Sequence, residues 1–247
     1  MGHLSLTEVK TVLDFLWRVR RTVDHGSFIA LILQGLKTLI PCELVGYYEV
    51  HAASGSIHAT ALPTSVLVPE GTSAITRHYR DHPLILHHIR TGDGTPRRVT
   101  DMASMRMFRG TALFSEVYRP ARIGLEMAMA LPAAPGVVRC VALGRDSRDF
   151  SERDLEVLHL VRPYLCETQR DLDATGNVQS LSPRERDVLA LVARGKTNVE
   201  IAAVLSISPR TAQKHLEHIY DKLGIRRRAG AAMLAQVHHF RDSVPGK

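Results

Sequence analysis

The sequence predicts an α+β domain followed by a small all-α domain of four helices. In the first 180 residues, segments with helical spacing of apolar residues alternate with short segments typical of strands. The last quarter instead contains three helix-start signals at short intervals. We therefore expect a first domain at residues 1–172, a linker with Gly176 and Asn177 at 173–180, and a second domain at 181–247.

The expected elements of the first domain follow from this spacing. Helices are expected at residues 5–24, 27–39, 73–90 (broken near Pro83), 102–108, 112–118 and 151 to about 171. Two antiparallel hairpins are expected, from strands at 44–51 and 56–62 and from strands at 124–131 and 136–143, with a polar loop at 91–98. This order predicts a central antiparallel sheet flanked by helices.

Three helix caps organise the second domain. Ser182, followed by Pro183 and Glu185, forms a capping box, and Thr197 with Glu200 forms another. Ser208-Pro209 is a third cap, after a tight connection. Two short helices joined by a minimal turn are the helix-turn-helix arrangement, in which the second helix enters the major groove of DNA.

The second of these helices, residues 209–223, divides by spacing into two faces. Its expected buried seam consists of Ala212, Leu216, Ile219 and Leu223. The outward face carries Arg210, Gln213, Lys214 and Glu217, whose side chains suit base edges. A flanking row of Thr211, His215, His218 and Lys222 suits phosphates. An ordinary amphipathic helix with a solvated polar face is the alternative.

Charge favours the DNA-binding interpretation. From residue 181 onward the chain has 12 Lys plus Arg against 6 Asp plus Glu, whereas residues 1–180 have 20 against 19. Nearly all of the excess positive charge therefore lies in the second domain, as expected for a protein that binds a polyanion. Arg226, Arg227 and Arg228 follow the second helix directly and are suited to phosphate contact.

The second domain resembles the LuxR-type helix-turn-helix of bacterial transcription regulators. The matching residues are those at 181–189, Gly195, Asn198, those at 200–202 and 207–211, His215, and those at 223–226. The resemblance implies a homodimer on a two-fold-related site in double-stranded DNA, with dimer contacts from a closing helix at residues 229–240. Two positions depart from the family pattern, because Ala212 replaces a β-branched residue and Gln213 replaces a basic one. The expected DNA-contacting residues are Thr197, Asn198, Arg210, Thr211, Gln213, Lys214, Glu217, His218, Lys222, Arg226 and Arg227.

The order of elements in the first domain resembles GAF-like sensor domains. The segments at residues 82–84, 91–94, 117–120 and 150–154 carry this looser resemblance. It implies a binding or signalling role without identifying a ligand. Small side chains at Ala128, Ala130, Cys140 and Ala142 share one face of the second hairpin. That face either packs closely on a helix or holds a small molecule near Ala128, Cys140 and Tyr48.

Four histidines, His78, His82, His87 and His88, are candidates for a metal site. The spacing of His78 and His82 suits a metal, but Pro83 interrupts the helix and no further ligands complete the set. We expect no metal or other cofactor and interpret the four as a partly exposed, pH-responsive cluster. The chain also lacks the nucleophile-elbow, Walker, dinucleotide-binding and zinc-protease motifs, so no enzyme is expected.

Composition sets the remaining expectations. A hydrophobic share of 45% is typical of a folded protein, and the chain shows neither a membrane-length apolar run nor a signal peptide. Cys42, Cys140 and Cys166 suit a reducing cytoplasm. We expect a cytoplasmic DNA-binding regulator with no membrane contact, controlled by a signal sensed at the first domain. A small-molecule effector and a contact with RNA polymerase remain open. The alternatives are a ligand-free dimerisation or partner-binding module and a catalytic domain with a DNA-binding tail.

Overall fold

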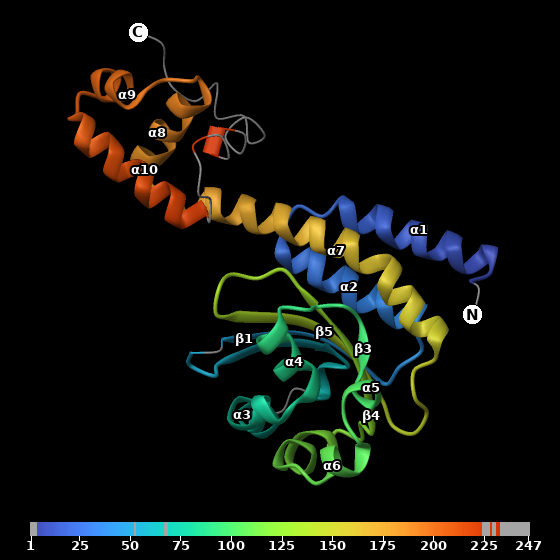
Figure 1. Cartoon of the computed structure of the whole chain (residues 1–247). Helices are drawn as coiled ribbons and strands as arrows, with labels where there is room; N and C mark the ends of the chain where they lie inside the picture. The colour runs from blue at the N-terminus through green and yellow to red at the C-terminus, as the bar shows by residue number, and fades with distance from the viewer. Residues whose placement is uncertain (1–3, 52, 67–68, 224–227, 229–230, 233–247) are drawn as a thin grey trace. The chain divides into compact units, whose positions relative to one another are not determined.

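A computed structural model describes residues 4–51, 53–66, 69–223, 228 and 231–232 of the chain (Figure 1). These residues belong to two compact units, residues 1–169 and residues 170–247. No helix among the described residues is both long and apolar enough to span a bilayer.

A five-stranded antiparallel sheet forms the centre of the first unit. Its strands are β1 (Leu44–His51), β2 (Ile57–Leu62), β3 (Arg97–Arg98), β4 (Leu125–Leu131) and β5 (Val137–Arg145), in the order β2-β1-β5-β4-β3. Both predicted hairpins are present. Strand β3 was expected to be loop, because two residues are too few to show alternation.

Three helices cover one face of this sheet (Figure 1). They are α1 (Leu6–Arg20), α2 (His25–Leu39) and the beginning of α7 (Glu152–Gln179). Helix α1 buries Val12, Phe15 and Val19. The Phe15 ring lies so close to Gly35 on α2 that a Cβ atom at this position would stand 2.3 Å from the ring. Gly35 therefore allows the two helices to approach closely.

Short helices lie over the opposite face of the sheet (Figure 1). They are η1 (Thr64–Val66), α3 (Pro69–His78), η2 (Tyr79–Asp81), α4 (Pro83–Thr91), α5 (Val99–Met102), α6 (Met105–Arg109) and the π-helix η3 (Phe114–Tyr118). The predicted break near Pro83 is present, with His82 as the N-cap of α4. The single helix predicted at 102–108 is instead two helices, because Ala103 is extended and ends α5. The predicted α+β class, with an antiparallel sheet between helices, is confirmed.

Helix α7 is longer than the sequence indicated. It was expected to end near residue 171, but it continues to Gln179, so most of the predicted linker at 173–180 is helical. Gly176 and Asn177 were the residues that favoured a linker in the sequence. A glycine in a helix interior costs only about 1 kcal/mol, however, and a long helix tolerates that cost.

The second unit contains α8 (Pro183–Ala193), α9 (Asn198–Leu205) and α10 (Pro209–Leu223). Both predicted capping boxes are present, and the Ser208 hydroxyl accepts a hydrogen bond from the Thr211 backbone N–H (3.0 Å). Gly195 has a φ of +77° and lies just beyond the end of α8. Arg226, Arg227 and most of the predicted closing helix at 229–240 lie outside the described residues.

Candidate nucleic-acid interface and ligand cavity

Helix α10 separates a buried seam from an exposed face. The buried residues are the four predicted from spacing: Ala212, Leu216, Ile219 and Leu223. They pack with residues of α8 and α9 in one apolar core. This packing holds α10 rigidly on the unit while its other side faces outward.

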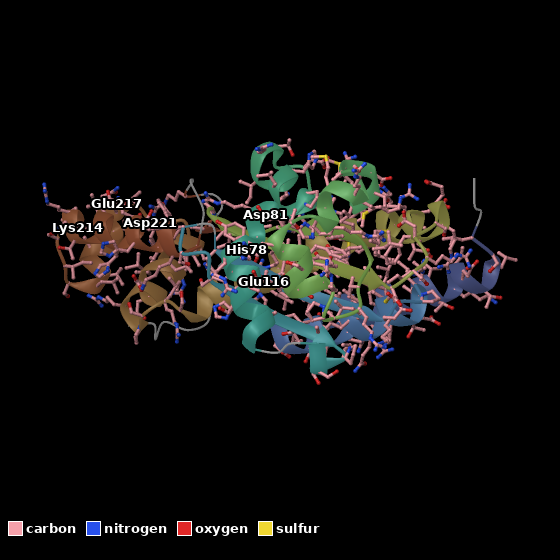
Figure 2. The ribbon with its side chains drawn as sticks, turned by 90° about the horizontal axis from the view of Figure 1, so that it is seen from below. His78, Asp81, Glu116, Lys214, Glu217 and Asp221 are labelled. Carbon is pink, nitrogen blue, oxygen red and sulfur yellow. The ribbon has the colours of Figure 1, made fainter. Side chains whose placement is uncertain are left out.

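The exposed face of α10 carries most of the predicted DNA contacts. Arg210, Gln213, Lys214, Glu217, His218 and Lys222 are exposed, and Thr211 is half-buried. Lys214 and Glu217 lie along this face together with Asp221, which the sequence prediction did not include (Figure 2). Cations for phosphate and polar groups for base edges are therefore presented on one side of a single helix.

A chain of hydrogen bonds orients Gln213 on this face. Arg228 Nη1 donates to Asn198 Oδ1 (2.8 Å), and Asn198 Nδ2 donates to Gln213 Oε1 (2.6 Å). Gln213 Nε2 in turn donates to Glu217 Oε1 (3.1 Å). Because arginine only donates and carboxylate only accepts, the two ends of the chain determine the orientation of both amides. Gln213 keeps one N–H and one lone pair free, which is the pair that adenine requires.

Two predicted contact residues also stabilise the fold. Thr197 is the N-cap of α9, and its hydroxyl donates to Glu200 (3.0 Å). Lys222 Nζ lies 2.7 Å from Glu185 Oε2, and Glu185 is itself buried within the capping box of α8. Burial disfavours the charged form of Glu185, but hydrogen bonds from Lys222 and Ser182 outweigh it and lower the pKa of this carboxyl below 4.5.

This lowered pKa predicts an acid-dependent loss of stability. The stabilisation by Glu185 is fully present above its unfolded pKa and is lost as the pH falls through the lower folded pKa. Glu185→Gln should cost about 1 kcal/mol at pH 7 and weaken the pH dependence below 4.5. Hydrogen exchange of α8 amides in the full chain measures this. Asp187→Asn, at a half-buried position on the same helix outside the capping box, is the control, and equal pH profiles for wild type and Glu185→Gln would contradict the assignment.

The first unit contains a cavity of about 420 Å³ between the sheet and the short helices. Its floor follows from the register of the strands. Ala142 on β5 lies between Gly46 on β1 and Ala128 on β4, and Ala128 in turn lies opposite Arg97 on β3. This row leaves open space where larger side chains would fill the interior. Of the two sequence interpretations of the small-residue face, the structure therefore shows a cavity rather than a close-packed helix. The predicted ligand residues Tyr48, Ala128 and Cys140 all line it.

Two hydrogen-bond donors in the cavity wall lack partners. The Tyr48 hydroxyl has none among the described residues, and the buried Arg97 Nε also has none. Burial raises the pKa of Tyr48 and raises that of Cys140 to about 12, so both side chains remain protonated. Arg97 Nη2 donates to Asp93 Oδ2 (2.8 Å), and this bond contributes most to holding the pKa of Asp93 well below its usual range. Unpartnered donors in a cavity wall favour a bound molecule with acceptor oxygens.

A buried carboxylate, Glu126, lines the cavity. Glu126 Oε1 lies 2.9 Å from His82 Nε2, and the Tyr118 hydroxyl donates to Glu126 Oε2 (2.7 Å). His82 Nδ1 accepts from the Ile85 backbone N–H, so we assign the ring proton to Nε2. Glu126 therefore accepts from two buried donors, while His82 caps α4. The sequence analysis missed Glu126, Tyr118 and Arg97. A lone carboxylate within the apolar strand at 124–131 was the available signal.

The four histidines do not form one cluster. His82 binds Glu126, whereas His87 Nε2 lies 3.4 Å from Asp93. His78 lies 3.3 Å from Glu116, at the place where α3 and η2 meet η3 (Figure 2). The described residues contain no group of three or more His, Cys, Asp or Glu side chains placed to hold a metal ion. The single cluster expected from the sequence is therefore wrong, because His78, His82 and His87 each meet a different carboxylate, whereas His88 Nδ1 lies 3.1 Å from the Asp93 backbone carbonyl.

Comparisons with known proteins agree with this structure. Residues 179–235 match the model of the family "Bacterial regulatory proteins, luxR family". The probable transcriptional regulatory protein SgaR of Hyphomicrobium methylovorum is 41% identical over 80 residues, which are 32% of this chain and 38% of SgaR. The transcriptional activator protein BjaR1 of Bradyrhizobium diazoefficiens is 36% identical over 105 residues, which are 42% of this chain and 43% of BjaR1. The chain thus spans less than half the length of each of these relatives.

A solved structure resembles the fold more broadly. The VqsR LBD domain from Pseudomonas aeruginosa superposes with a TM-score of 0.53 at 17% identity, covering 68% of this chain and 99% of that domain. This likeness concerns the fold alone. Residues 179–235 of this chain thus match the luxR family of bacterial regulatory proteins, and helices α8 to α10 within this range form a LuxR-type helix-turn-helix.

Proposed function

We propose that this protein is a transcription regulator that binds duplex DNA sequence-specifically through α10, as a homodimer on a two-fold-related site. The observation that carries the proposal is the polar face of α10, which is mostly exposed on a helix whose opposite side packs in an apolar core. Helix-turn-helix units read the major groove with such a helix. A regulator of this kind acts in the bacterial cytoplasm, where RNA polymerase is a further candidate partner.

We propose that the first unit senses a small molecule in the sheet cavity. A volume of about 420 Å³, a floor of small residues and two unpartnered donors support this role over a ligand-free module. The ligand would have an apolar body and acceptor oxygens facing Tyr48 and Arg97. Its binding would shift the population between conformations that differ in DNA affinity. We assign no catalytic step to these residues.

Replacing Lys214 tests the reading face. Lys214→Ala should weaken specific binding by about 1–3 kcal/mol and relax the preference at one base position, because Lys pairs with guanine. Binding to a library of operator variants measures both effects. Lys37→Ala, an exposed lysine of the first unit, is the charge-matched control. An equal loss on every sequence would assign Lys214 to the phosphates instead.

Native mass spectrometry of protein purified from its own host tests the sensor role. We expect a retained mass of a few hundred daltons on part of the protein, in keeping with cavities of this size. If the protein retains no added mass, and if its DNA binding does not change when host extract is added, the ligand-free module would be favoured. Turnover in a broad hydrolase and transferase screen would instead support the catalytic alternative.

A further inference from the structure

Two half-buried residues outside α10 hold the side chain of Gln213. Asn198 is the first residue of α9, and Arg228 follows α10 in the sequence. Arg228 Nη1 donates to Asn198 Oδ1 (2.8 Å), while its Nη2 donates to the Lys196 backbone carbonyl. Asn198 Nδ2 then donates to Gln213 Oε1 (2.6 Å). One end of this hydrogen-bond chain is therefore anchored to the backbone, and the other end reaches the exposed face of α10.

Glu217 fixes the outer end of the hydrogen-bond chain. Its Oε1 accepts from Gln213 Nε2 (3.1 Å), and it lies on the exposed face of α10 (Figure 2). Reversing the Gln213 amide would turn its oxygen toward the Glu217 carboxylate and its nitrogen toward the Asn198 Nδ2 donor. One contact would then join two acceptors and the other two donors. The free protein therefore presents Gln213 in one orientation before it meets DNA.

The orientation of this amide decides which adenine it matches. In the major groove, adenine shows the N7 acceptor beside the N6 donor, so a glutamine must place an N–H at N7 and its oxygen at N6. These two groups come in one order across an A·T pair and in the opposite order across a T·A pair. An amide that is free to rotate can follow either order, whereas a fixed amide follows only one. Holding Gln213 therefore selects adenine on one strand of the duplex.

We infer that Asn198, held by Arg228, is a positioning residue that sets the base preference of Gln213. This inference rests on the proposed function, because it assigns the specificity of the same reading face. The sequence placed Asn198 and Gln213 among the DNA contacts as separate residues. Here the two act as one unit, in which Gln213 contacts the base and Asn198 determines which atoms Gln213 presents.

Asn198→Asp tests this role, because a carboxylate accepts hydrogen bonds but does not donate them. The new carboxylate still accepts from Arg228, but Gln213 then has an acceptor on each side, and neither orientation of its amide is satisfied. Helix α9 should form as before, because an acidic residue in the first turn interacts favourably with the helix dipole. In selection from a randomised duplex library, the adenine preference at one position should fall by at least about tenfold, the lower end for a bidentate contact.

A second substitution should restore selectivity. In Asn198→Asp/Glu217→Gln, the new amide at the second position donates to Gln213 Oε1, so the hydrogen-bond chain is complete in the reverse direction. Selection should again give a defined adenine, now on the opposite strand. Glu217→Gln alone should keep the wild-type adenine, because its amide oxygen still accepts from Gln213. A double variant as unselective as Asn198→Asp would overturn the inference, since a second substitution does not repair a purely structural defect.

Val199→Asp is the charge-matched control. It adds the same negative charge at the next residue of α9, where the side chain is 66% exposed and outside the hydrogen-bond chain. It should weaken binding to all sequences alike, because the added charge repels phosphates. The same uniform loss for Asn198→Asp, with the adenine preference unchanged, would overturn the inference and make Asn198 a phosphate contact.

The hydrogen-bond chain is also measurable without DNA. In NMR spectra of the free full chain, the Asn198 Nδ2 protons should exchange with water more slowly in the wild type than in Gln213→Ala, which removes their acceptor. Equal exchange in the two proteins would overturn the inference and leave DNA binding by α10 untouched. A wild-type protein that selects no DNA sequence would instead remove the proposed function, and the base preference inferred here with it, even if the Asn198 amide is protected.

Discussion

Glu126→Ala is expected to destabilise the first unit by roughly 2–5 kcal/mol, because it leaves two buried donors without an acceptor. The Tyr118 hydroxyl and His82 Nε2 both donate to this carboxylate, and the three side chains are less than 10% exposed. Burial raises the pKa of Tyr118 far above its usual value, so the phenol remains a donor at neutral pH. Urea unfolding of the full chain, followed by hydrogen exchange of β4 and α4 peptides, measures the loss.

Two milder variants separate the causes of this loss. Glu126→Gln keeps the shape of the side chain but can accept a hydrogen bond from only one of the two donors. Its free energy of unfolding should therefore lie between those of the wild type and Glu126→Ala. Tyr118→Phe removes one donor and should cost about 1 kcal/mol. If Glu126→Ala were as stable as the wild type, water in the cavity would have to accept hydrogen bonds from both donors. The carboxylate would then not be needed for the stability of the first unit.

Filling the cavity is expected to abolish ligand retention. Ala142→Met places a long side chain on the floor between Gly46 and Ala128, where a ligand would lie. We expect the retained mass to disappear and the response of DNA binding to host extract to fall at least about 100-fold, because the added atoms occupy the ligand volume. Stability should change by less than about 1.5 kcal/mol, because the methionine enters existing space.

A substitution outside the cavity is the control for Ala142→Met. Ala134→Met adds the same atoms to an exposed position in the connection between β4 and β5, and it should leave ligand retention unchanged. Retention of the same mass by Ala142→Met would place the ligand elsewhere on the protein. Loss in both variants would point to a general effect of the added methionine rather than to the cavity.

Local patterns were sufficient to predict the helix-turn-helix from the sequence. Its capping residues lie three positions from their partners, and the seam of α10 repeats every three or four residues, so the information lies within single turns of helix. The two hairpins of the first unit were predicted for the same reason. Sequence spacing also placed Ala128 and Cys140 on one face of a strand pair, where the structure shows the cavity.

Only the tertiary structure decided which distant side chains meet. The Glu126–His82 contact joins residues 44 positions apart, and the Arg20–Glu167 pair joins residues 147 positions apart. Neither has a periodic signal, because such contacts depend on how elements pack rather than on the turn or strand in which each residue lies. For the same reason, the sequence showed a small-residue face but not whether a helix fills it, since that depends on where the short helices settle over the sheet.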